Sequence, residues 1–280
     1  MRPSEVLRQA ERCLDRHGVE SPRVTAEILL GHVLRTDRAG LFARVEPLSG
    51  QEARAFGRAL CRRCAGAPVQ HLTGEQVFRG ILLRVRPGVF VPRPETEVVV
   101  DAVLDAVRGV PRPVVVDVGT GTGAIALAVK RERPDAEVHA VDHAADAVAV
   151  ARENASALGL EISVTEGDLL DPLPERSRGR VAAVVSNPPY VGREEYDDLP
   201  PEVRADPYDA LVGGTEVHRR LAVGAPAWLR ADGALVMEIG SAQGDEVAEV
   251  LRRGGYAGVE VLTDLTGRER VVIGRRGAAP

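Results

Sequence analysis

Over the first 65 residues, apolar side chains recur at the three- and four-residue spacing of helices. One helix is expected to open at Pro22, because proline suits the first helical position. Another is expected to follow the capping box that Ser49 and Glu52 can form. Three side chains of the Pro22 helix are expected to face inward: Val24, Ile28 and Leu29. Residues 1–74 are therefore predicted to form a small helical domain.

The next segment, residues 75–90, is predicted to be a β-hairpin that links this domain to the rest of the chain. Gly66, Pro68 and Gly74 break the helical pattern before it. The residues from Phe78 to Val85 read as strand, with an interruption at Gly80 where the chain is expected to turn.

Residues 91–280 alternate short apolar runs with stretches of helical spacing. The runs predicted to be strands are 114–118, 138–142, 162–165, 181–185 and 233–239. The stretches predicted to be helices are 124–132, 145–158, 216–229 and 244–253. Continuous apolar strands separated by helices indicate a mostly parallel sheet that is buried on both faces. Two further strands, 259–262 and 269–273, are expected to pair antiparallel at one edge.

Composition narrows the class of protein. Of the 280 residues, 44% are hydrophobic, which is enough for a core and too many for a disordered chain. No apolar run approaches the ~18 residues of a membrane span, and the N-terminus lacks the apolar stretch of a signal peptide. The three cysteines are too few for a disulfide framework. We therefore expect a cytoplasmic protein that does not contact a membrane.

The net charge of −5 argues against a general nucleic-acid binder. The charge is uneven along the chain. Residues 1–75 carry 12 Arg against 9 acidic residues, a balance of +3, whereas the remainder carries 24 basic and 32 acidic residues, a balance of −8. The N-terminal part is therefore the candidate for contact with an acidic partner.

The first chemical motif, Asp117-Val-Gly-Thr-Gly-Thr-Gly123, follows a predicted strand and opens a helix, as a nucleotide-binding loop does. Its glycines let the backbone turn sharply and approach a ligand closely. The spacing differs from that of dinucleotide-binding loops, and no Gly-Lys-Ser/Thr of a phosphate loop is present. Asp142 ends the next strand, 23 residues after Gly119, where a carboxylate can accept both ribose hydroxyls of an adenosine. A simple tight turn is the weaker alternative.

The second motif, Ser186-Asn187-Pro188-Pro189-Tyr190, directly follows the fourth predicted strand. The Asn187 side-chain oxygen and the Pro188 carbonyl can accept both N–H hydrogens of a planar nitrogen. Two such acceptors position the nitrogen and favour positive charge on it as it forms a new bond. Tyr190 can pack flat against the planar group. The alternative, a plain Pro-Pro turn, is disfavoured because both motifs follow strands of one sheet and converge at its carboxyl edge.

Weaker signals flank these motifs. Asp168 and Leu169 end the predicted strand that begins at Ile162. In one interpretation Asp168 binds an adenine amino group and Leu169 covers the ring. In the other, Asp168 is a polar residue at the end of the strand and Leu169 belongs to the core. The segment from Arg93 to Glu97 has ordinary helix-start chemistry, and the alternative is that Phe90 and Arg93 wall the substrate site.

Cys61-Arg-Arg-Cys64 has the spacing of half a zinc site, but no second pair completes it. It lies in a helical pattern, so structural cysteines are the favoured interpretation. His17, His32 and His71 form no ligand-spaced group, and no metal is expected. Because no histidine lies in or beside the two motifs, no general base is expected to be essential.

Several segments together resemble the HemK/PrmC family of release factor glutamine methyltransferases. They are Ala67–Gly74, Arg93-Pro-Glu-Thr-Glu97, the glycine loop through Ala128, Asn187 to Tyr190, and Glu269-Arg-Val271. The resemblance covers essentially the whole chain. Leu169 is a departure, since some members carry a large aromatic residue over the adenine at that position.

The resemblance implies an α/β fold with a class I, Rossmann-like, seven-stranded methyltransferase domain, a small N-terminal helical domain and a linking β-hairpin. It implies methyl transfer from S-adenosyl-L-methionine to the side-chain amide nitrogen (N5) of the glutamine in the Gly-Gly-Gln loop of class 1 peptide chain release factors. The implied cofactor-binding residues are Gly119, Thr120, Gly121, Thr122, Gly123, Asp142, Asp168, Leu169 and Asn187. The implied catalytic residues are Asn187, Pro188 and Tyr190, and the implied substrate-binding residues add Pro189, Phe90 and Arg93.

Two other substrates stay open at this point. One is a glutamine of a ribosomal protein, and the other is an exocyclic amine of a nucleobase. The nucleobase alternative is disfavoured, because it needs a module that grips nucleic acid and the chain is acidic overall. We expect a monomer that acts on a protein and makes no direct contact with nucleic acid.

Overall fold

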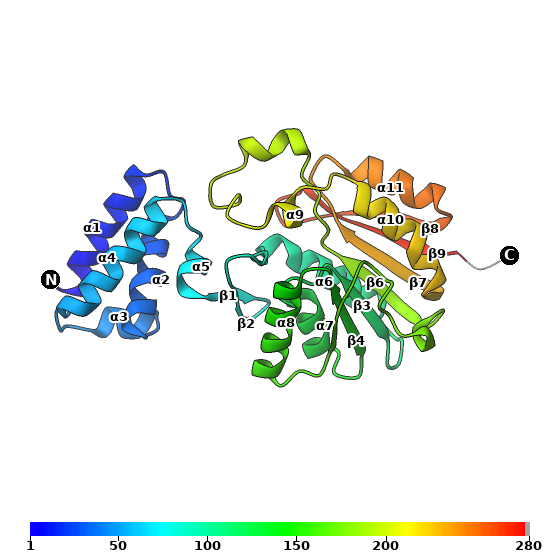
Figure 1. Ribbon diagram of the computed structural model, residues 1–280, viewed down its shortest axis with the longest axis horizontal. Coiled ribbons are helices and arrows are strands. Elements are labelled where there is room, and N and C mark those ends of the chain that lie inside the picture. The colour runs from blue at the N-terminus through cyan, green and yellow to red at the C-terminus, as the bar shows by residue number, and fades with distance from the viewer. Residues whose placement is uncertain (278–280) are drawn as a thin grey trace. The chain divides into compact units, whose positions relative to one another are not determined.

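The computed structural model describes residues 1–277 and divides into two compact units (Figure 1). Unit 1 comprises Met1–Glu75 together with Leu199–Ala205. Unit 2 comprises Gln76–Asp198 and the chain from Asp206 onward. Within the described residues, no helix has the length and apolar character needed to cross a membrane.

Unit 1 consists of helices packed around a small apolar core. The helices are α1 (Pro3–Arg16), α2 (Pro22–Leu34), α3 (Arg38–Ala43), α4 (Gly50–Cys64) and α5 (Val69–Thr73). Pro22 opens α2, and Ser49 and Glu52 cap α4 reciprocally, so both sequence predictions are confirmed. The core includes Leu7, Leu14, Leu30 and Phe56.

The buried face of α2 differs from the prediction. Val24 and Ile28 are 52% and 45% exposed, whereas Leu29 is buried as expected. The helix is apolar around most of its circumference, so the spacing of its apolar residues does not single out one face. Packing against α1 and α4 selects the face instead. The side chains that this face buries include Ala26, Leu29 and Leu30.

A short excursion of the chain, Leu199–Ala205, completes unit 1. Arg63 of α4, whose side chain is only 7% exposed, forms a salt bridge with Glu202 of this segment. Gly66 packs closely against it, since a Cβ atom at Gly66 would lie 3.1 Å from the Cβ atom of Pro201. The sequence analysis had included these seven residues in the range 91–280.

Unit 2 contains a two-stranded hairpin and a seven-stranded sheet. The hairpin is β1 (Glu75–Phe78) and β2 (Ile81–Arg84), and the sheet strands are β3 (Val114–Val118), β4 (Glu137–Asp142), β5 (Ser163–Glu166), β6 (Val181–Ser186), β7 (Leu229–Glu238), β8 (Tyr256–Thr263) and β9 (Glu269–Arg276). The sheet order is β5-β4-β3-β6-β7-β9-β8, and β9 runs opposite to the other six strands, so it is antiparallel to both β7 and β8. This confirms the predicted class I, Rossmann-like methyltransferase sheet with an antiparallel edge pair.

Helices cover both faces of the sheet (Figure 1). The helices of unit 2 are α6 (Glu97–Ala106), α7 (Ala124–Glu132), α8 (Ala145–Leu158), α9 (Tyr208–Leu211), α10 (Glu216–Gly224) and α11 (Gly244–Arg253), with 3-10 turns at Pro94–Thr96, Glu175–Ser177, Arg193–Asp198 and Ala225–Ala227. Along β3, Val115 packs into the core beneath α6 and α7, whereas Val114 and Val116 pack into the core beneath α10 and α11. This two-sided burial explains why β3 is apolar at four of its five positions.

The helix predicted at 216–229 ends earlier than expected. In the structure α10 stops at Gly224, and β7 begins at Leu229. Pro226 cannot continue the helix, because it lacks the backbone N–H and its ring clashes with the preceding turn.

Candidate active site

The glycine loop lies between β3 and α7 and turns at three glycines with positive φ. Gly119, Gly121 and Gly123 have φ angles of 70°, 56° and 83°, which other residues adopt only with strain. A Cβ atom at Gly119 or Gly121 would meet no heavy atom within 4 Å. The space beside these two glycines is therefore open, and only backbone conformation requires glycine there.

Asp142 ends β4 and is held against the same loop. One of its carboxylate oxygens accepts from the Gly121 N–H at 2.8 Å, and the other accepts from the Ala144 N–H at 3.0 Å. A carboxylate has about four lone-pair positions, so these two bonds leave capacity for further donors. Asp142 thus fixes the loop and keeps acceptors available beside it.

Asp117 ends up beneath the loop and is almost completely buried. Its Oδ2 atom accepts from the Thr120 hydroxyl at 2.6 Å and from the Ala126 N–H at 3.1 Å. Within residues 1–277 its Oδ1 atom has no hydrogen-bond partner. Burial raises the pKa of Asp117 to about 7, against the effect of these two donors. Asp117 is therefore a buried carboxyl group that residues 1–277 satisfy only in part.

The second motif follows β6, the strand beside β3 in the sheet. The pairing of Val118 with Ser186 brings the glycine loop and this motif to one carboxyl edge, and the Ser186 hydroxyl donates to the Val118 carbonyl at 2.8 Å. The Asn187 Nδ2 group donates to the buried Thr96 hydroxyl oxygen at 3.2 Å. This bond orients the Asn187 amide through its nitrogen, and the Oδ1 atom of the same amide can only accept hydrogen bonds.

The backbone of the motif is braced from two sides. Gly213 lies against Pro189, because a Cβ atom there would be 2.5 Å from the Pro189 carbonyl oxygen. The Gln243 side chain donates to the Tyr190 carbonyl at 2.8 Å and accepts from the Gly240 N–H at 2.9 Å. The loop conformation is thus set by segments that follow it in the chain.

Glu238 at the end of β7 is a site residue that sequence analysis missed. It is 2% exposed, and burial raises its pKa to about 7. Hydrogen bonds with Thr96 and Tyr190 oppose this shift, as does the charge of Arg270. Glu238 therefore contacts the two groups that flank Asn187. Its place at the carboxyl end of a predicted strand was the one available signal.

Phe90 and Arg93 are joined to the loop that follows the motif. The Arg93 guanidinium lies 5.3 Å from the centre of the Phe90 ring and forms a salt bridge with Asp206. The Asp206 side chain is fully buried and also accepts from the Val91 N–H at 3.2 Å. Burial raises the pKa of Asp206 to about 6, which the charge of Arg93 counteracts. Sequence analysis did not single out Asp206.

Asp168 and Leu169 were expected at the end of the strand that begins at Ile162, but β5 ends at Glu166 and both residues lie in the segment that follows it. Asp168 is exposed and forms a salt bridge with Arg220. Leu169 has a φ angle of 47°, uncommon for a leucine, and it packs at the margin of the apolar core beneath α10.

Comparisons with known proteins agree with this geometry. Residues 5–74 match the family model of the PrmC N-terminal domain, and residues 82–201 match that of the methyltransferase small domain. A release factor glutamine methyltransferase of Moorella thermoacetica is 42% identical, covering 97% of this chain and 98% of that one. One of Deinococcus radiodurans is 43% identical, covering 99% of both chains.

Solved structures are similar in fold. A 16S rRNA N2 methyltransferase of T. thermophilus, in complex with AdoMet and guanosine, has a TM-score of 0.54 and 20% identity, covering 72% of this chain and 49% of that one. A methyltransferase of Pyrococcus furiosus has a TM-score of 0.53 and 15% identity, covering 79% and 100%. The fold is thus shared with methyltransferases, and the full-length identity to the curated relatives is decisive: the chain belongs to the family of release factor glutamine methyltransferases.

Proposed function

We propose that the protein transfers a methyl group from S-adenosyl-L-methionine to the side-chain amide nitrogen (N5) of the glutamine in the Gly-Gly-Gln loop of class 1 peptide chain release factors. The amide nitrogen attacks the methyl carbon, the carbon–sulfur bond breaks, and S-adenosyl-L-homocysteine leaves. The nitrogen then loses a proton to water. A single chain suffices, because both motifs lie in one unit, and the reaction belongs in the cytoplasm, where release factors work.

The orientation of Asn187 carries this proposal. An amide nitrogen is a poor nucleophile, so it needs acceptors that hold both of its hydrogens and favour the developing positive charge. The Thr96 hydroxyl oxygen accepts a hydrogen bond from the Asn187 Nδ2 group. The Asn187 Oδ1 atom is proposed to accept one N–H hydrogen of the substrate amide, and the Pro188 carbonyl is proposed to accept the other. Tyr190 is proposed to cover the planar amide. Phe90 and Arg93, linked to Asp206, are proposed to wall the substrate site.

The cofactor is proposed to lie over the glycine loop. The open space beside Gly119 and Gly121 admits a ligand close to the backbone, and Asp142 has acceptors left for the ribose hydroxyls. The buried Oδ1 atom of Asp117, which lacks a partner among the described residues, suits a cationic group of the ligand. Leu169 is proposed to cover the adenine, and Asp168 would have to leave Arg220 to bind its amino group.

Asp117 predicts a pH dependence of cofactor binding. Between about pH 4 and pH 7, Asp117 is protonated in the folded protein without ligand but ionised in the unfolded chain. The free energy of unfolding should therefore fall as the pH rises through this range. A ligand with an ammonium group favours the ionised carboxylate. The affinity for S-adenosylhomocysteine should therefore rise with pH up to about 7. Calorimetry between about pH 4 and pH 7 measures the dissociation constant of S-adenosylhomocysteine, and Asp117→Asn should remove most of its dependence on pH. A wild-type profile as flat as that of the variant contradicts the assignment.

The identity of the protein substrate can be tested with S-adenosylmethionine that carries a labelled methyl group. With labelled S-adenosylmethionine, the methyl group should enter a class 1 release factor at the loop glutamine, and Gln→Ala in that loop should abolish uptake. Ribosomal proteins and RNA, offered separately, should stay unlabelled. A methyl group mapped by mass spectrometry to another residue, to a ribosomal protein or to RNA would refute the proposed substrate and favour one of the two alternatives.

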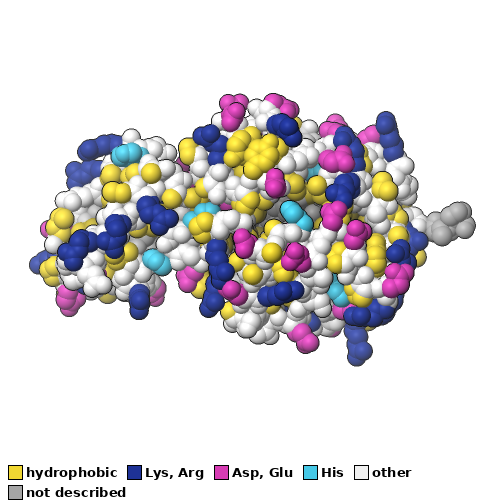
Figure 2. Space-filling view, in the orientation of Figure 1, with side chains coloured by type: hydrophobic (Ala, Val, Ile, Leu, Met, Phe, Trp, Pro, Cys, Tyr) yellow, Lys and Arg dark blue, Asp and Glu magenta, His cyan; other side chains and the backbone are white. Residues whose placement is uncertain are grey.

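Selection of the release factor is proposed to come from unit 1. Residues 187–190 are proposed to contact only the side-chain amide of the glutamine, which is the same in every protein. Another surface therefore has to recognise the release factor. Unit 1 is mildly basic, and Figure 2 shows Arg side chains spread over its visible face. Exposed arginines of this unit include Arg8, Arg12, Arg16, Arg54, Arg58 and Arg62.

A further inference from the structure

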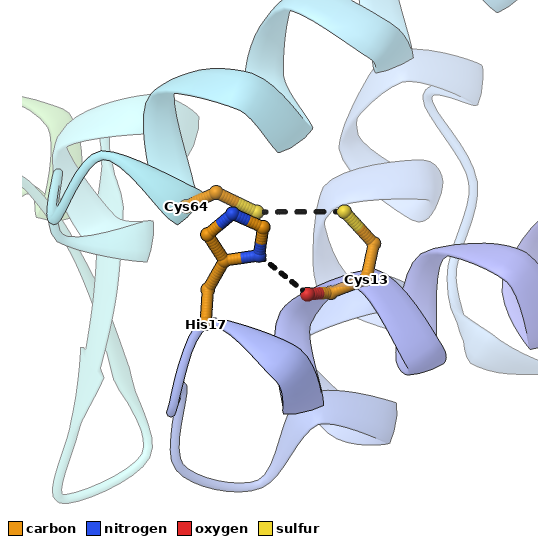
Figure 3. A group of neighbouring side chains, drawn as sticks. All are labelled: Cys13, His17 and Cys64. Atoms are coloured by element: carbon orange, nitrogen blue, oxygen red, sulfur yellow. Dashed lines mark hydrogen bonds between the residues drawn. The ribbon is translucent and has the colours of Figure 1, made fainter.

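The helical unit brings together three side chains that can ligate a metal: Cys13, His17 and Cys64 (Figure 3). Their ligand atoms all lie within 4.8 Å of one another. None of them belongs to the proposed reaction site. We propose that this group binds a thiophilic divalent cation, foremost Zn²⁺, through three protein ligands and one ligand from solvent.

The distance between the two sulfur atoms fits a shared metal ion. Cys13 Sγ and Cys64 Sγ are 3.8 Å apart. Two thiolates that each lie about 2.3 Å from one tetrahedral Zn²⁺ are themselves separated by about 3.8 Å. A disulfide instead requires about 2.05 Å between the sulfur atoms, so the two sulfur atoms would have to move closer together. The observed spacing therefore suits coordination without rearrangement.

His17 is oriented as a metal ligand usually is. Its Nδ1 atom lies 2.8 Å from the Cys13 carbonyl oxygen, and an N–H at Nδ1 can donate to that acceptor. Figure 3 shows the other ring nitrogen turned toward the Cys64 sulfur. A backbone acceptor for one ring nitrogen fixes the tautomer and leaves the lone pair of the other nitrogen for the metal.

The surroundings favour a cation. Cys13 lies in the last turn of α1 and His17 directly follows that helix, while Cys64 is the last residue of α4. The carboxyl ends of two helices therefore meet here, and their dipoles present partial negative charge. Both cysteines are half-buried and His17 is exposed, so an ion can enter from solvent and still be partly shielded. Thiolate and imidazole select Zn²⁺ over Mg²⁺ or Ca²⁺.

Bound metal would clamp the ends of α1 and α4 together. Arg63, next to Cys64, holds Glu202 of the 199–205 segment, so the clamp would also steady the anchor of that segment. An ion that binds only the folded chain stabilises it in proportion to the logarithm of its concentration over its dissociation constant. We therefore expect Zn²⁺ to stabilise unit 1 without contributing to the transfer chemistry.

The test uses the full-length, reduced protein. After metal removal, titration with Zn²⁺ should saturate at one ion per chain and raise the midpoint of thermal unfolding. Co²⁺ should give tetrahedral visible bands together with a thiolate charge-transfer band. Cys13→Ser, Cys64→Ser and His17→Gln should each weaken Zn²⁺ binding more than tenfold, with circular dichroism confirming that each variant is folded.

Cys61→Ser is the matched control, because Cys61 is an exposed cysteine one turn away on the same helix. It should bind Zn²⁺ like the wild type. The proposal is overturned if the wild type takes up no stoichiometric Zn²⁺, or if Cys61→Ser loses binding as much as Cys64→Ser does. It is equally overturned if mass spectrometry shows a Cys13–Cys64 disulfide in the isolated protein, two hydrogens lighter than the dithiol, and the reduced protein does not bind Zn²⁺. The two cysteines would then be a redox pair.

Discussion

Asn187→Ala should lower the rate of methyl transfer by about 10²–10³-fold, because it removes one of the two preorganised acceptors proposed for the substrate amide. Cofactor affinity should be largely kept, since the glycine loop and Asp142 remain intact. A turnover assay on a release factor, together with calorimetry of S-adenosylhomocysteine, separates the two effects. Near-normal turnover of the variant would contradict the role assigned to Asn187.

Two further variants distinguish contact with substrate from positioning. Thr96→Val removes the partner that orients the Asn187 amide but leaves its oxygen present, so the loss in rate should be smaller than for Asn187→Ala. Asn187→Asp keeps an acceptor but adds a charge, and it should retain more activity than alanine. Equal losses for Thr96→Val and Asn187→Ala would indicate that the site collapses rather than loses one acceptor.

Asp142→Ala should weaken S-adenosylhomocysteine binding about 5- to 150-fold, which corresponds to the ~1–3 kcal/mol of leaving polar partners unpaired. Part of this loss will come from the Gly121 and Ala144 N–H groups that the carboxylate now accepts from. Asp142→Asn is the matched control, since it keeps an acceptor for the loop and removes the charge. An unchanged dissociation constant in the alanine variant would place Asp142 away from the ribose.

The sheet could be predicted from sequence because each buried strand carries its own local signal. β3 and β6 are apolar apart from Asp117 and Ser186, and the structure buries every one of their residues. Helices α8 and α11 begin and end where the sequence analysis placed them, and α8 is followed by Gly159, which adopts the left-handed conformation typical of a helix end. The parallel order then brings the two motifs to one edge without further information.

The supporting residues could not be predicted, because their partners are distant in sequence. Thr96 is separated from Asn187 by 91 positions, and Asp206 from Arg93 by 113. No local periodicity encodes such contacts. The same holds in unit 1, where the sequence paired Cys61 with Cys64 but the fold places Cys64 beside Cys13. The four-residue spacing of Cys13 and His17 at the end of α1 is the local sequence signal that places these two side chains on one face.

The excursion of residues 199–205 into the helical unit has a consequence for the order in which the protein is made. Unit 1 opens the chain, yet its last segment emerges from the ribosome only after most of unit 2 has been synthesised. The 130 residues between 75 and 205 take roughly 6 to 26 s at about 5–20 residues per second. During this interval the Arg63 guanidinium lacks its salt-bridge partner, Glu202. The first domain to be translated therefore cannot be completed until most of the second has been synthesised.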